Sequence, residues 1–169
     1  PRGFKLIKSS AGLSVNTVTR AVTAAVNATY TLYVGDPYKL TNGIAERAID
    51  GDTVQGIITG FVLKPVVGQS EGPASQDYLP VATDGEIIGV EDKAAEFEVQ
   101  IEPFALSDIG TTADLAVYAA GSLALKQSRA SLVSTGTGTQ FTLTGLVDRP
   151  ADNAIGANAK VRCRLAQTV

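Results

Sequence analysis

Two short segments with alternating apolar and polar side chains constrain the fold more than any other feature of this sequence. In residues 97–102 and again in residues 160–165, every second side chain is apolar and the others are charged or polar. Successive side chains of a β-strand point to opposite faces, so each segment predicts a strand with one face in a core. The side chains expected to point inward are Phe97, Val99, Ile101, Val161, Cys163 and Leu165. Cys163 is therefore expected to be a buried apolar residue rather than a reactive thiol.

The rest of the sequence also favours strands. Val and Thr each occur 17 times among the 169 residues, and β-branched residues fit pleated surfaces. Turn-forming residues separate the apolar runs, and we expect further strands at residues 29–34, 38–40, 53–63, 86–90, 115–118, 123–126 and 139–147. Gly56 and Gly60 interrupt one of these runs, which indicates a bulge or a close backbone approach. Together these features predict an all-β fold, an antiparallel β-sandwich or a β-barrel of the jelly-roll or tulip-like kind.

Helical signals are weak. Valines at helical spacing in residues 15–26 are interleaved with threonines that favour extended chain. We expect residues 1–28 to form an extended N-terminal arm or first strand, and residues 29–169 to form a single β-rich domain. Short helical turns are expected at residues 104–106 or 113–115, and exposed loops at residues 67–77 and 131–139. The loop at residues 148–160 is expected to be a well-defined connection between two strong strands.

The composition excludes many kinds of active site. The chain has no His and one Cys, so Ser-His-Asp and Cys-His nucleophile pairs, disulfides and His- or Cys-rich metal sites are excluded. The sequence Asp50-Gly51-Asp52 lacks the further acidic ligands of a calcium loop, and a plain turn is expected there. The glycine-rich residues 135–139 lack the Lys-Ser/Thr ending of a phosphate loop. We therefore expect a non-enzymatic protein with no catalytic residue, metal or cofactor.

Carboxylate chemistry is the main enzymatic alternative. The adjacent Glu91 and Asp92 could supply the paired carboxylates of a glycoside hydrolase, as could the outward-facing Glu96, Glu98 and Glu102. A sugar site also needs an aromatic platform, and the chain has no Trp and only five Tyr. A polar docking face is the preferred interpretation of these glutamates.

Charge is unevenly distributed along the chain. The net charge is −3, but residues 1–20 carry four basic and no acidic side chains, whereas residues 21–120 carry four basic and 15 acidic ones. Residues 121–169 carry six basic and two acidic side chains. Basic ends around an acidic centre could serve docking between subunits, and a solvated mixed surface is the alternative. No dense basic run suggests nucleic-acid binding, and no apolar run approaches the length of a membrane span.

Several segments resemble tailed-bacteriophage capsid cement or decoration proteins. The resemblance lies in residues 3–10 (GFKLIKSS), 34–40 (VGDPYKL), 51–57 (GDTVQGI), 97–100 (FEVQ) and 149–161 (RPADNAIGANAKV). The sequence departs from the family pattern at Ala151, which separates Pro150 from Asp152. The family implies a β-rich protein without catalytic residues that binds the outer surface of an icosahedral head. It also implies synthesis in the host bacterial cytoplasm and contacts with the major capsid protein and with itself, a homotrimer being favoured and a dimer possible.

The expected function is thus that of a capsid cement protein located on the virion. The candidate capsid or subunit contacts are Arg2, Phe4, Lys5, Leu6, Ile7, Lys8, Arg149, Asp152 and Asn153. The first six form a basic, apolar docking or swapped arm, and the last three lie in a polar loop held by a rigid scaffold. The alternative is a carbohydrate-binding β-sandwich module on a virion surface, which would require an exposed row of the tyrosines.

Overall fold

The computed structural model confirms the all-β fold. It describes residues 3–8, 16–62, 77–116, 121–122, 124–134, 139–149 and 153–166. The strands are β1 (Lys5–Lys8), β2 (Thr17–Val22), β3 (Leu32–Tyr33), β4 (Pro37–Thr41), β5 (Ile44–Arg47), β6 (Gly56–Val62), β7 (Tyr78–Leu79), β8 (Gly85–Val90), β9 (Glu96–Ile101), β10 (Thr112–Leu115), β11 (Leu132–Val133), β12 (Phe141–Leu146) and β13 (Ala159–Leu165). A 3-10 turn, η1 (Leu106–Asp108), follows β9. Within these ranges no helix is long and apolar enough to cross a membrane.

One half of the molecule is a small barrel, which we call the barrel half (residues 3–8 and the described residues from 95 onward). Its strands pair in a closed ring, β9–β13–β12–β10–β11 and back to β9, with β1 added beside β9. Only the β11–β9 pairing is parallel. The two alternating segments of the sequence face each other, because Phe97 pairs with Cys163 and Val99 with Val161. Their apolar side chains are buried as predicted.

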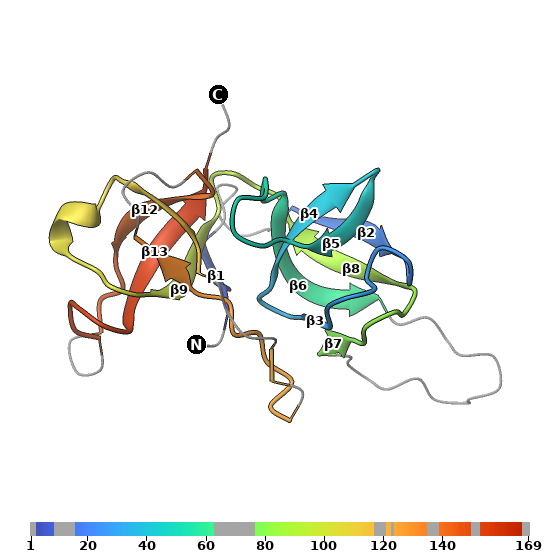
Figure 1. Ribbon diagram of the computed structural model, residues 1–169. Helices are drawn as coiled ribbons and strands as arrows, with labels where there is room; N and C mark the ends of the chain where they lie inside the picture. The colour runs from blue at the N-terminus through green and yellow to red at the C-terminus, as the bar shows by residue number, and fades with distance from the viewer. Residues whose placement is uncertain are drawn as a thin grey trace.

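The other half, which we call the sheet half (residues 16–62 and 77–94), lies beside the barrel (Figure 1). Its main sheet is antiparallel with the order β2-β8-β6-β4-β5, and β3 and β7 form a separate two-stranded sheet. A second apolar cluster fills this half, with Leu32, Tyr38, Ile58 and Ile87 at its centre. The segment expected as an arm or first strand therefore contributes β1 to the barrel half and β2 to the sheet half.

The two halves share one core and several direct bonds. Ala48, Val54, Ile57 and Val90 of the sheet half belong to the same apolar cluster as the barrel interior. The side-chain amide of Gln140 donates to the carbonyl oxygens of Ile49 and Asp52, each over 2.8 Å. The Phe4 N–H donates to the Gly35 carbonyl over 2.9 Å. Each of these contacts crosses between the halves, so the barrel is not packed independently of the sheet.

The predicted glycine features are present in β6. The register of β6 against β8 shifts between Ile58 and Gly60, which marks a bulge. At Gly56 an added β-carbon would lie 2.6 Å from the Val90 carbonyl oxygen and 2.9 Å from the Tyr38 ring, so this position requires glycine. Gly89 of β8 is equally close, since a β-carbon there would lie 2.5 Å from the Tyr38 ring. The two glycines thus make room for the fully buried ring of Tyr38.

Some sequence predictions of local structure were wrong. Residues 124–126, predicted as strand, form a turn, because Ser122 and Gln127 pair across it and Lys126 has a positive φ of 49°. Residues 113–115, offered as a helical turn, lie in β10, and the helical turn that does occur is η1. Three short strands were missed: β5, β7 and β11. Residues 63, 67–76, 117–118, 123 and 135–138 of the predicted strands and loops lie outside the described residues.

The space around Tyr38 leads to a first prediction. Gly89→Ala should lower the free energy of unfolding by about 1–3 kcal/mol, because the new methyl group would overlap the Tyr38 ring. Gly60→Ala is the matched control, since its β-carbon would be no closer than 3.7 Å to the nearest heavy atom, in Ile88. Chemical denaturation of both variants measures the difference. Equal stabilities of the two variants would contradict the packing described for β8.

Asp36 leads to a second prediction, on pH. Burial raises its pKa from 3.8 to about 6, although Ser128, Arg47 and the Tyr33 N–H favour the ionised form. The protonated carboxyl therefore stabilises the fold fully below about pH 4, and this contribution is lost as the pH rises through 6. Asp36→Asn should gain stability relative to wild type between these pH values, by about 3 kcal/mol at neutral pH. Asp50→Asn, at an exposed position, is the control and should follow the wild-type pH profile.

Candidate functional site

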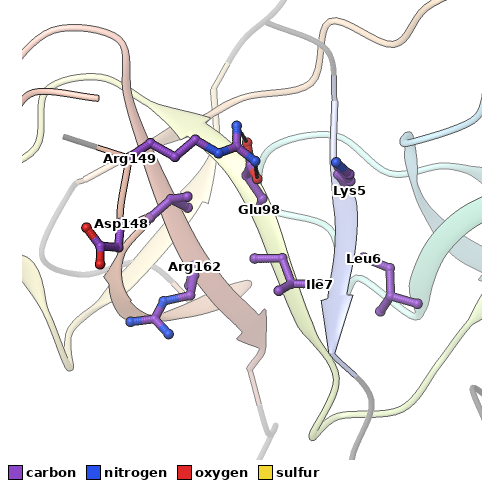
Figure 2. Close-up of a pocket in the computed structure, with 8 residues that line it drawn as sticks. Lys5, Leu6, Ile7, Glu98, Asp148, Arg149 and Arg162 are labelled. Atoms are coloured by element: carbon purple, nitrogen blue, oxygen red, sulfur yellow. Dashed lines mark hydrogen bonds and ion pairs between the residues drawn. The ribbon is translucent and has the colours of Figure 1, made fainter. Parts of the chain in front are cut away.

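An open groove on the outside of the barrel brings together both ends of the chain. It has a volume of about 560 Å³ and is lined by Lys5, Leu6, Ile7, Glu98, Val147, Asp148, Arg149 and Arg162. These residues come from β1, β9, β13 and the segment that follows β12. Figure 2 shows Glu98 on β9 between Lys5 of β1 and the side chain of Arg149. Four of the predicted contact residues thus meet in one place, since Arg149 lies beside Lys5, Leu6 and Ile7 although it is more than 140 positions away in the sequence.

The side chains of β1 alternate between the surface and the barrel core. It pairs antiparallel with β9, Lys5 opposite Glu98 and Leu6 opposite Phe97. Leu6 packs against the barrel core, whereas 46% of Ile7 is exposed. Phe4, just before the strand, stacks on Phe141 with ring centroids 4.7 Å apart. β1 is therefore fixed from inside the barrel while Lys5 and Ile7 remain on the surface.

Arg149 is held in place by a two-point ion pair. Its guanidinium nitrogens lie 3.1 and 2.8 Å from the two carboxylate oxygens of Glu98. The Arg149 side chain is 42% exposed, and an ion pair of this kind on a surface contributes at most about 1 kcal/mol to stability. Arg164 of β13 binds Glu96 of β9 through a single contact of 2.9 Å. The two-point ion pair with Glu98 therefore orients the Arg149 side chain more than it stabilises the fold.

Two other basic side chains in the groove are without a charged partner. Among the described residues, neither Lys5 nor Arg162 forms an ion pair or a side-chain hydrogen bond, and both are exposed. Ile7 and Val147 supply apolar surface near them. The groove therefore combines apolar surface with two cations, Lys5 and Arg162, and one carboxylate, Asp148, none of which forms an ion pair within the described part of the chain. Such a surface favours a ligand that carries both apolar and acidic groups.

The structure places two predicted contact residues inside the fold. Phe4 is 4% exposed and Asn153 is 9% exposed, so neither offers its side chain to a partner. The Asn153 side chain donates to the Val147 and Lys160 carbonyls over 2.7 and 2.8 Å and accepts from the Lys160 N–H over 2.7 Å. Its role is to tie the two ends of the connecting loop together. Because Phe4 belongs to the core, removing residues 1–10 would damage the barrel as well as the groove.

The remaining predicted contacts are less defined. Arg2 and Asp152 lie outside the described residues, and of Lys8 only the backbone, at the end of β1, is described. Sequence reasoning missed four lining residues: Glu98, Val147, Asp148 and Arg162. The alternating pattern had placed Glu98 and Arg162 on outward faces, but only the β9–β13 register shows that they are opposite each other.

The described residues offer little for catalysis. They contain no group of three or more Cys, Asp or Glu side chains that could hold a metal ion. Glu96 and Glu98, the candidate hydrolase carboxylates, are engaged by Arg164 and Arg149. Cys163 is fully buried, and burial raises the pKa of its thiol. The turn at Asp50-Gly51-Asp52 is present, and the Asp52 carboxylate is bound to the Lys39 ammonium over 3.0 Å.

The tyrosines do not form an exposed row in the described residues. Tyr33 and Tyr38 are buried, and Tyr78 stacks on Tyr33 at 6.0 Å between ring centroids. The Arg47 guanidinium lies over the Tyr30 ring at 4.7 Å. Tyr118 lies outside the described residues. This arrangement lends no support to the carbohydrate-binding alternative.

Comparisons with known proteins add nothing to this description. No protein-family model, no curated protein and no solved structure matches the chain. The residues and geometry of the groove, together with the resemblance of the sequence segments, are therefore what bears on function.

The loop anchor leads to a third prediction. Asn153→Ala should lower the free energy of unfolding by about 2–4 kcal/mol, because it leaves the Val147 and Lys160 backbone groups without their partners. Asn16→Ala, at an exposed position, is the control and should change stability by no more than about 0.5 kcal/mol. Thermal unfolding of both variants measures the difference. Indistinguishable melting temperatures would show that Asn153 does not hold the loop.

Proposed function

We propose that this chain is a non-enzymatic decoration protein that binds the outer surface of an icosahedral phage head. There it bridges major capsid protein subunits and stabilises the shell. The single observation that carries the proposal is the groove, in which Lys5, Ile7 and Arg149 come together on a rigid surface. The resemblance of residues 3–10 and 149–161 to the cement-protein family includes those three residues.

The properties of the groove suit a docking role. Arg149 is already oriented by Glu98, and β1 is anchored through Phe4, so little side-chain or backbone freedom is lost when a partner binds. A protein repeated over a lattice also gains avidity, because neighbouring copies hold one another near their sites. Modest affinity at each groove is then sufficient for a stable layer. In this function the groove keeps each copy within the decoration layer.

The proposal also agrees with the chemistry of the described residues. The carboxylates of Glu96 and Glu98 are bound to Arg164 and Arg149, and the thiol of Cys163 is buried. A decoration protein needs a stable scaffold and an exposed docking surface rather than a reactive group. The shared core of the two halves supplies such a scaffold.

Binding to heads tests the proposal and gives a fourth prediction. Heads purified without this protein, from the phage that encodes it, should bind the wild-type chain and sediment with it. The double variant Lys5→Glu, Ile7→Asn should reduce occupancy at least about tenfold, since it reverses a charge and removes apolar surface in the groove.

Arg129→Glu provides the matched control, because Arg129 is exposed and does not line the groove. Circular dichroism should give the same folded spectrum for all three proteins. Failure of the wild-type chain to sediment with heads, or full occupancy by the double variant, would contradict the proposed function.

A further inference from the structure

The two halves of the molecule carry opposite net charge. In the described residues of the sheet half, four Arg and Lys stand against nine Asp and Glu. In those of the barrel half, eight Arg and Lys stand against six Asp and Glu. Two of these eight basic residues, Lys126 and Arg129, follow Gly121, which lies against the Tyr33 ring of the sheet half, whereas the acidic excess of the sheet half beside the barrel does not depend on them (Figure 1). Two copies attract each other when the barrel half of one meets the sheet half of the next.

The sheet half presents a rigid acidic turn at residues 49–52. The Asp52 N–H donates to the Ile49 carbonyl over 3.1 Å, and the Asp52 carboxylate accepts from the Ile49 N–H over 2.8 Å. Gln140 binds the carbonyl oxygens at both ends of the turn, each over 2.8 Å. Gly51, with a φ of 81°, allows the chain to reverse. The backbone of this acidic turn is thus fixed before any partner binds.

The two side chains at the start of the acidic turn project from it without a partner. Ile49 is 42% exposed. Asp50 is exposed, and among the described residues its carboxylate forms no ion pair or hydrogen bond. An apolar side chain beside a free carboxylate complements the apolar side chains Ile7 and Val147 and the two free cations of the groove.

We propose that the groove of one copy binds the acidic turn of a second copy. Ile49 of the second copy covers the apolar floor at Ile7 and Val147, and Asp50 binds the free cations Lys5 and Arg162. In Figure 2 these two cations lie on opposite sides of β9, with Glu98, which is already bound by Arg149, on the strand between them. The inference rests on the proposed function only in treating the groove as a docking surface. The groove is then a site of contact between copies of the protein and not a site of contact with the capsid shell.

This contact is heterologous, because it joins two different surfaces. An open assembly of this kind keeps one free groove at one end and one free acidic turn at the other, so it grows as a chain unless it closes into a ring. A contact between two sheet halves is disfavoured, since both carry excess negative charge.

A complementation experiment in solution tests the proposal, with analytical ultracentrifugation as the measurement. The wild-type chain should associate at low salt and dissociate as salt rises, since ions screen charges beyond about 10 Å. The groove variant Lys5→Glu, Arg162→Glu and the turn variant Ile49→Ser, Asp50→Ser should each associate at least about tenfold more weakly. An equal mixture of the two variants contains one intact groove and one intact turn. It should form a dimer of one copy of each that grows no further.

Two control variants are measured in the same experiment. Arg129→Glu and Asp77→Ser, at exposed positions outside both surfaces, should associate like wild type. A wild-type chain that is monomeric at low salt, or a mixture that forms no mixed dimer, would overturn the inference. A groove variant that associates normally but no longer binds heads would place the groove against the shell, which also overturns it while the proposed function stands. Normal association without any head binding would leave this inference intact and remove the proposed function.

Discussion

The pairing of β9 with β13 is the interaction on which the rest of the structure depends. It closes the barrel and buries Phe97 against Cys163 and Val99 against Val161. The same register places Arg162 opposite Glu98 on the outer face. On its other edge, β9 pairs with β1, so that β9 lies between the first described strand and β13. Core and groove are thus the two faces of one strand, and a shift by one residue would exchange them.

A small set of polar contacts then fixes the sheet half against the barrel. Gln140 reaches across to the acidic turn, and buried Asp36 lies in the tight turn where Phe4 binds the Gly35 carbonyl. In the sheet half, burial alone would raise the pKa of Glu91, but hydrogen bonds from Arg20, Gln55 and Tyr38 lower it overall. Buried polar groups of this kind are costly to leave unsatisfied, so they specify one relative arrangement of the elements.

The sequence predicted the parts of the fold that depend on local pattern. The alternation of apolar and polar side chains was sufficient to predict β9, β13 and the burial of Cys163. A strand with one face in the core has an apolar side chain at every second position, and this pattern is visible in the sequence. β11 was missed since it is two residues long and its pairing with β9 at Ile101 is non-local. The groove was foreseen only as separate contact residues, because its assembly depends on strand register. Asn153 was misplaced, since a polar loop residue that binds backbone groups has the same sequence signature as one that binds a partner.

The construction of the groove also links docking to folding. β1 carries Lys5 and Ile7 on its outer side and follows directly on Phe4, whose ring packs on Phe141 in the core. A partner that binds Lys5 and Ile7 binds only when β1 is paired with β9, so it stabilises that pairing by mass action. The same partner therefore keeps Phe4 in the barrel. A partner that docks through this groove would therefore strengthen the fold of the protein as well as the assembly that it joins.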